Sequence, residues 1–219
     1  MLARLPPWVE FGAFLLAFLA GSVNAVGLLG FSHQSVSHLT GTSSLLGLAL
    51  AELALSDVLH LLFTLMSFLA GATLSGLLIT STALRLGRHY GFSLLIESAL
   101  LLLAMLFLQR GSDFGIYLAS MACGLQNAMV TTYSGSIIRT THLSGIFTDL
   151  GIMLGNRLRG IPLNGRRLLL FLLLISGFIC GGVIGTLLFR LLHFSALVAP
   201  AILAALLAAI YWGYSRQYR

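Results

Sequence analysis

The stretch SHLTGTSSLLG at Ser37–Gly47 decides the predicted fold, because a variant of it, THLSGIFTDLG, returns at Thr141–Gly151. An Asn-Ala pair lies upstream of each block, with a one-residue difference in spacing. Self-similarity at a long interval indicates an internal repeat, in which two halves share one architecture. The aligned residues are Asn24 with Asn127, His38 with His142, Thr40 with Ser144, and Gly41 with Gly145.

Each block leads into an apolar run that is too short to cross a membrane. As helices, Thr42–Leu55 and Ile146–Leu158 would each rise only about 20 Å, whereas a bilayer core of about 30 Å needs about 20 residues. We therefore predict two re-entrant half-helices that begin near mid-membrane. Thr40 and Ser144 are the predicted N-caps, and the glycine after each permits close backbone approach. The positive ends of the two helices would then meet at the centre.

Longer apolar runs surround these two. Of the 219 residues, 58% are hydrophobic and 8% are charged, and the mean hydropathy is +1.00. Soluble domains carry about 25% charged residues, so this chain has too few to cover a water-facing surface. We predict an all-α, polytopic membrane helix bundle that forms a single membrane domain. The candidate spans are Val9–Phe31, Val58–Ser81, Gly91–Leu108, Phe114–Tyr133, Leu168–Phe189 and Phe194–Tyr214.

Arginine placement distinguishes two topologies. If the short runs are re-entrant, there are six spans in two inverted repeats, at about 8–109 and about 112–215. If the short runs cross, there are eight full spans in parallel repeats. With a cytoplasmic N-terminus, the six-span arrangement puts ten of the twelve arginines inside and only Arg110 and Arg190 outside, whereas the eight-span arrangement leaves four outside. Because positive residues concentrate on the cytoplasmic side, we predict six spans with both termini cytoplasmic.

Two acids lie inside apolar segments. Glu97 is within a predicted span, where a carboxylate is costly and indicates a functional site; the alternative is that it accepts hydrogen bonds from a re-entrant backbone. Asp149 is one turn into the second short helix, where the positive helix end alone explains an acid. The aligned residue of the first half is Leu45. Both acids are candidate pathway residues.

Histidines and amides complete the candidate site. Two histidines that meet at mid-membrane can relay protons or bind a metal; the alternative is a hydrogen bond from each imidazole to a loop carbonyl. We predict neither a metal site nor a cofactor. Amides on the long spans either join helices or contact a polar solute. The predicted substrate-binding or pathway residues are Asn24, His38, Thr40, Gly41, Thr42, Glu97, Gln126, Asn127, His142, Ser144, Gly145 and Asp149.

Several motifs carry a family resemblance: GSVNAVGLLGF at Gly21, HLTGTSSLLG at His38, ESALLL at Glu97, GLQNAMV at Gly124 and TTHLSG at Thr140. Together they resemble the YoaK-like family of bacterial inner-membrane proteins, a domain of unknown function. The resemblance implies a small multi-pass protein of the bacterial inner (plasma) membrane and supplies no activity. The family usually has an acid where Asn24 lies and an Asn where Thr42 lies. A proton or cation role for that acid would therefore not carry over to this chain.

The predicted function is that of a permease or channel for a small polar or anionic solute, with a central site formed by two half-helix N-termini. The expected partners are the lipid bilayer and that solute, homo-oligomers are compatible with the sequence, and no nucleic acid is expected because the arginines are scattered. One alternative is a non-transporting membrane assembly or sensor component. Another is an intramembrane enzyme that uses His38, His142 and Glu97. We do not expect an enzyme, because P-loop, GxSxG and HExxH signatures are absent.

Overall fold

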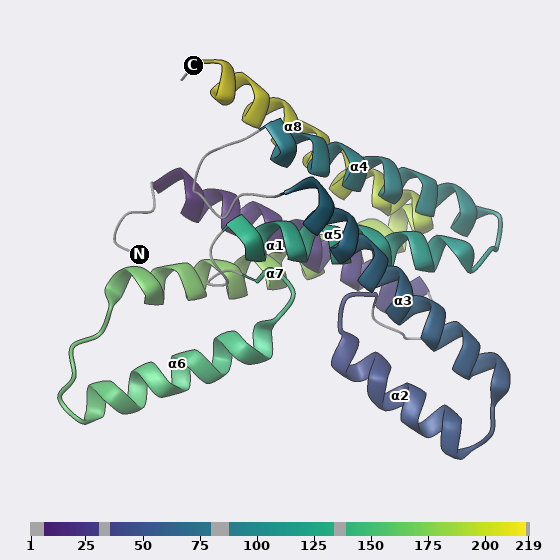
Figure 1. Ribbon diagram of the computed structural model, residues 1–219, viewed down its shortest axis with the longest axis horizontal. Coiled ribbons are helices and arrows are strands. Elements are labelled where there is room, and N and C mark those ends of the chain that lie inside the picture. Colours follow the sequence, from purple (N-terminus) through teal and green to yellow (C-terminus); the bar gives the residue numbers. More distant parts are fainter. Residues whose placement is uncertain (1–6, 31–35, 80–87, 134–138, 218–219) are drawn as a thin grey trace.

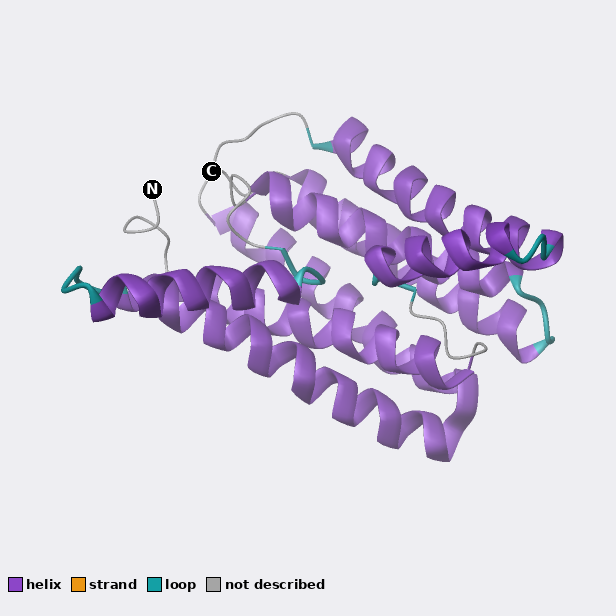
Figure 2. Ribbon diagram, turned by 90° about the horizontal axis from the view of Figure 1, so that it is seen from below, coloured by secondary structure: helices purple, strands orange, loops and turns teal. Residues whose placement is uncertain are grey.

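Helix makes up nearly all of the described chain in a computed structural model, which describes residues 7–30, 36–79, 88–133 and 139–217 (Figures 1 and 2). The predicted all-α bundle is confirmed at this level, because those residues contain no strand. The helices are α1 (Pro7–Gly30), α2 (Leu39–Ala51), α3 (Leu55–Leu78), α4 (Arg88–Gln109), α5 (Phe114–Tyr133), α6 (Leu143–Leu158), α7 (Gly165–Leu192), the 3-10 helix η2 (His193–Leu197) and α8 (Val198–Gln217).

The two short helices begin at Leu39 and Leu143, three residues before the predicted apolar runs at Thr42 and Ile146, and their N-caps lie two residues before the predicted Thr40 and Ser144. The reason is that the preceding histidines already supply the first helical acceptors. The His38 carbonyl accepts from the Thr42 N–H at 3.1 Å, and the His142 carbonyl accepts from the Ile146 N–H at 3.3 Å. The end of α2 also falls before the predicted Leu55, because Leu53 takes a positive φ of 56° in the turn that leads into α3.

Four apolar stretches of the described chain are long enough to cross a membrane: Glu10–Gly30, Leu55–Leu78, Tyr90–Gln109 and Gly165–Gly213, the last of which contains both α7 and α8. These stretches indicate a membrane-embedded protein. The helix α5 has its predicted bounds and is not among the four. Its polar residues, which include Gln126 and Asn127, lower its hydropathy.

Glycines bring helices from the two halves of the chain into backbone contact. The helix α1 packs along α7, and α3 packs along α5. A Cβ added at Gly181 would lie 1.9 Å from the Phe18 carbonyl oxygen, and one added at Gly71 would lie 1.9 Å from the Met121 carbonyl oxygen. Small residues of this kind allow helices to associate where lipid supplies no hydrophobic drive. Each crossing therefore requires a residue without a side chain.

A second pair of glycines, on α1 and α5, packs on backbone carbonyls of α7 and α3 in the same way. A Cβ added at Gly21 would lie 2.1 Å from the carbonyl oxygen of Phe178, and one added at Gly124 would lie 2.1 Å from that of Phe68. Gly21 and Gly124 each precede the asparagine of the repeated Asn-Ala pair by three residues. The similarity between the halves therefore extends from the sequence to the helix contacts.

The hairpins α2–α3 and α6–α7 extend toward opposite ends of the molecule (Figure 1). Both short helices begin near the middle and run outward, and each is followed by a turn and a long helix that returns (Figure 1). Helix α4 packs against α5 and α8. This arrangement places the N-terminal ends of α2 and α6 together and their C-terminal ends far apart.

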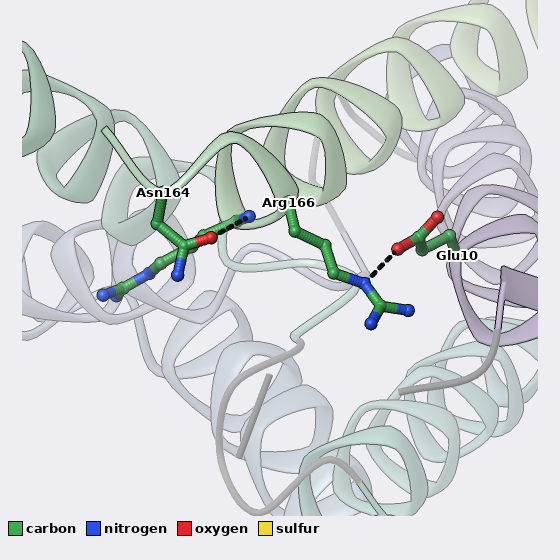
Figure 3. Close-up of polar contacts among 4 residues, drawn as sticks. Glu10, Asn164 and Arg166 are labelled. Carbon is green, nitrogen blue, oxygen red and sulfur yellow. Dashed lines mark hydrogen bonds and ion pairs between the residues drawn. The ribbon is translucent and has the colours of Figure 1, made fainter. Parts of the chain in front are cut away.

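An ion pair joins the starts of α1 and α7. Arg166 Nε donates to Glu10 Oε1 at 2.7 Å, and the neighbouring Asn164 caps α7 by accepting from the Arg167 N–H at 3.1 Å (Figure 3). A cap of this kind satisfies a backbone donor that the helix itself leaves unpaired. The contacts fix the beginning of α7, which α1 covers along its length.

Candidate functional site

A cavity of about 550 Å³ lies where the two short helices begin. Residues from both halves of the sequence line it, on α1, α2, α3, α5, α6 and α7 and on the segments that precede the short helices. The described lining residues are Asn24, Ser37, His38, Leu39, Thr40, Phe68, Ala72, Asn127, Ala128, Thr131, Thr132, Arg139, Thr141, His142, Leu143, Ser144 and Phe178.

The first two residues of each short helix line the cavity, directly after a histidine. His38 (φ −99°, ψ 72°) and His142 (φ −101°, ψ 58°) occupy the N-cap positions with closely similar backbone angles. Thr40 and Ser144, the predicted N-caps, are instead the second helical residues, because each helix begins one residue after its histidine. Neither histidine side chain caps its helix. The unpaired N–H groups of each first turn therefore face the cavity end of the helix.

Each histidine ring lies over the glycine three residues later. A Cβ added at Gly41 would lie 2.8 Å from His38 Cδ2, and one added at Gly145 would lie 2.6 Å from His142 Nδ1. Any side chain at these positions would push the ring aside. The group that lies against the glycine of each HxxG block is therefore the imidazole ring.

The two short helices also contain equivalent hydrogen bonds from hydroxyl side chains to the backbone. Ser44 Oγ donates to the Thr40 carbonyl oxygen at 3.1 Å, and Thr148 Oγ1 donates to the Ser144 carbonyl oxygen at 2.9 Å. Bonds from a residue to the carbonyl four positions earlier are common for Ser and Thr in membrane helices. They leave the N–H groups of the first turn untouched.

Two amides from the repeated Asn-Ala pairs face the cavity from α1 and α5. Asn24 Oδ1 accepts from Ser37 Oγ at 2.8 Å, which ties α1 to the segment that leads into α2. Asn127 Oδ1 is buried and has no hydrogen-bond partner among the described residues. A buried amide oxygen without a partner costs free energy, so this position of α5 is not explained by helix packing alone.

Arg139 is the residue that sequence reasoning missed. From the sequence, Arg139 was expected only to contribute to the cytoplasmic positive charge that sets topology, yet it lines the cavity beside the start of α6. Its position directly before the repeated TTHLSG motif was the available signal. No described lining residue is a carboxylate, so the cavity combines a guanidinium, two imidazoles and two helix N-termini with no compensating acid. The guanidinium and the two positive helix ends give the cavity a positive electrostatic potential.

The remaining predicted residues do not line the cavity. Gly41 and Gly145 lie behind the histidine rings, and Thr42 is buried with Oγ1 donating to the His38 carbonyl oxygen at 3.3 Å. Gln126 is fully buried and donates from Nε2 to the Leu16 carbonyl oxygen at 2.8 Å, which joins α5 to α1.

The two acids lie apart from each other and from the cavity lining. Asp149 Oδ2 accepts from Arg167 Nη2 at 2.8 Å, and the same guanidinium lies 5.2 Å from the Phe171 ring centroid. Glu97 is buried in α4, with Oε2 lacking a hydrogen-bond partner among the described residues. Within the described part of the chain, no three His, Cys, Asp or Glu side chains gather as metal ligands do.

Comparison with known proteins identifies a family without identifying an activity. No curated protein and no solved structure matches the chain. The model of one family, described as "Protein of unknown function (DUF1275)", matches residues 12–210, which include the whole cavity lining and both HxxG blocks. The resemblance drawn from the sequence motifs is thereby confirmed, and the chain belongs to the DUF1275 family of proteins of unknown function.

Proposed function

We propose that this protein is a permease or channel of the inner membrane that moves a small anion through the central cavity. The main support is that each half of the chain contributes a histidine, a hydroxyl residue and a helix N-terminus to one cavity. Repeat symmetry brings equivalent segments of the two halves together, and here the groups that meet are polar and line a cavity inside an apolar bundle. A shared solute accounts for polar groups at such a place.

The lengths of the short helices support a re-entrant arrangement. Helix α2 has 13 residues and α6 has 16, which correspond to about 20 and 24 Å of rise, against about 30 Å for a bilayer core. Their hairpins extend in opposite directions (Figure 1). We propose that the halves are inverted repeats, that six helices cross and that both termini are cytoplasmic. In this arrangement the cavity lies near the midplane, where inverted-repeat transporters bind their solutes.

The groups around the cavity favour an anion over a cation. Arg139 contributes a full positive charge, and the two first turns contribute N–H donors and positive helix ends. A cation would meet these groups without a carboxylate among the described lining residues. Carboxylate, phosphate and halide ions are all compatible with such donors, which supports a negatively charged solute.

The other two functions lack a supporting observation. A non-transporting assembly or sensor component would be favoured by densely packed central polar groups, whereas these groups line a cavity. An intramembrane enzyme would need Glu97 beside His38 and His142, and Glu97 is not among the described lining residues. Transport therefore remains the function that the geometry supports best.

Flux in proteoliposomes tests this proposal. The purified protein is reconstituted, and uptake of chloride, nitrate, sulfate and phosphate is compared with uptake of potassium and glycerol. We expect at least one anion to move faster than in protein-free vesicles, and the Arg139→Gln variant to lose tenfold or more of that rate. About tenfold corresponds to one lost charge-assisted hydrogen bond.

Arg159→Gln is the matched control, because Arg159 is an exposed arginine in the turn after α6 and does not line the cavity. It should transport like the unmodified protein. If no anion moves above the protein-free rate, the proposal fails. If the two arginine variants lose equal activity, the cavity is not the route.

A further inference from the structure

Glu97 lies outside the cavity lining, in the middle of α4, and is only 1% exposed. Its Oε2 atom has no hydrogen-bond partner among the described residues, and neither ion pair of the described chain includes it. An ionised carboxylate buried without a partner is among the most costly groups in a protein, and more so within a bilayer. Binding of a proton removes this cost, because the neutral acid carries no charge.

The neighbours of Glu97 connect it to α5. Helix α4 packs along α5, and Cys123 of α5 lies in the same buried cluster as Leu100 and Leu101, which are one turn from Glu97 on α4. Helix α4 also packs against α8 and η2, and no described residue of these two elements forms an ion pair with Glu97. No described cation compensates the carboxylate.

One face of α5 continues from Glu97 to the cavity. Cys123 and Asn127 are four residues apart on a helix, so they lie on the same face, one turn from each other. Asn127 lines the cavity and has an unpartnered Oδ1, and Thr131, one turn further, lines the cavity and donates to the Asn127 carbonyl oxygen at 2.6 Å. The α5 face therefore carries polar groups from the buried carboxyl to the solute cavity.

We propose that Glu97 is the proton-binding group of a proton–anion symporter, with protons exchanging between Glu97 and the cavity along the α5 face that carries Cys123 and Asn127. This inference rests on the proposed function and names its coupling ion. One proton added to the Glu97 carboxylate gives the neutral acid, and one monovalent anion bound in the cavity offsets that proton. The combined movement is electroneutral, so the membrane potential should not drive it.

Vesicles that contain a trapped pH-sensitive dye test the coupling. Inward gradients of chloride, nitrate, sulfate and phosphate are imposed in turn, and the internal pH is recorded. The account predicts internal acidification that requires the protein, does not change with an imposed membrane potential for a monovalent anion, and is lost in Glu97→Gln. The variant should keep the exchange of labelled for unlabelled anion, because its cavity is intact.

Glu52→Gln is the matched control, since it removes an exposed carboxylate at the end of α2. It should acidify like the unmodified protein. Glu97→Asp retains an acid and should retain coupling with an altered pH profile, which separates loss of the proton site from misfolding. Anion flux without acidification, or unchanged acidification in Glu97→Gln, overturns the coupling and leaves the proposed function standing. The absence of any anion flux overturns both.

A measurement that does not depend on transport examines the proton site itself. Infrared difference spectra between acidic and alkaline pH should show a buried carboxylic acid band that is present in the unmodified protein and missing in Glu97→Gln. A spectrum in which the two proteins share every carboxylic acid band contradicts the assignment, whatever the flux assays show.

Discussion

Gly181 of α7 lies directly on the carbonyl group of Phe18 in α1, so closely that an added Cβ would be 1.9 Å from the oxygen. The same distance separates an added Cβ at Gly71 of α3 from the Met121 carbonyl oxygen of α5. At both crossings, α1 with α7 and α3 with α5, a glycine of one helix therefore packs directly on a backbone carbonyl of a helix from the other half. Their integrity determines whether the central cavity keeps its shape.

Gly181→Ala and Gly71→Ala should each destabilise the protein by about 1–3 kcal/mol, because a methyl group forced against a backbone carbonyl moves the whole helix. The controls are in the same helices: Gly182→Ala, where the nearest atom is 4.0 Å away, and Gly76→Ala, where nothing lies within 4 Å. Thermal unfolding in detergent should show lower midpoints for the first pair alone. Equal midpoints in all four variants would show that the crossings tolerate separation.

Gly41→Ala and Gly145→Ala should impair anion flux while leaving the unfolding midpoint nearly unchanged. The added methyl group displaces the His38 or His142 ring, which lines the cavity, and alanine is otherwise a favourable helix residue. Gly47→Ala and Gly151→Ala in the same helices have open space around the added carbon and should transport normally. Normal flux in the first pair would exclude a role for the ring positions.

The two ion pairs of the described chain should differ in how much they contribute to the free energy of unfolding. The side chains of Asp149 and Arg167 are 42% and 40% exposed, whereas those of Glu10 and Arg166 are 16% and 30% exposed. Asp149→Asn should therefore change the free energy of unfolding by less than about 1 kcal/mol and leave anion flux intact. Glu10→Gln should lower the unfolding midpoint further, since it leaves a less accessible guanidinium unpaired. The reverse order would show that burial does not govern these pairs.

Helices that are marked by an apolar run or by a repeated motif could be predicted from the sequence. The run of apolar residues predicted α5 at its observed bounds, and the repeated HxxG blocks predicted two short helices whose beginnings line one cavity. The start of each short helix was misplaced because hydroxyl residues are the usual N-caps, whereas here the histidine carbonyl takes the first hydrogen bond.

The partners of the charged residues were not predictable in the same way. Asp149 is paired with Arg167 across an α6–α7 contact, and Arg139 lines the cavity, yet neither fact follows from spacing along the chain. Pairings between side chains on different helices depend on rotation and crossing geometry. The amides illustrate the same limit, since Gln126 joins α5 to α1 while the adjacent Asn127 lines the cavity.

The central claim is that α2 and α6 begin inside the membrane from opposite sides, and cysteine accessibility in intact cells tests it most directly. Single cysteines at Ser56, after the α2–α3 turn, and at Pro162, after the α6–α7 turn, are introduced into a protein that lacks Cys123 and Cys180. Both positions are exposed. The account predicts that an impermeant thiol reagent added outside labels the Ser56→Cys variant and reaches the Pro162→Cys variant only after the membrane is opened. Labelling of both positions from the same side would contradict the inverted arrangement.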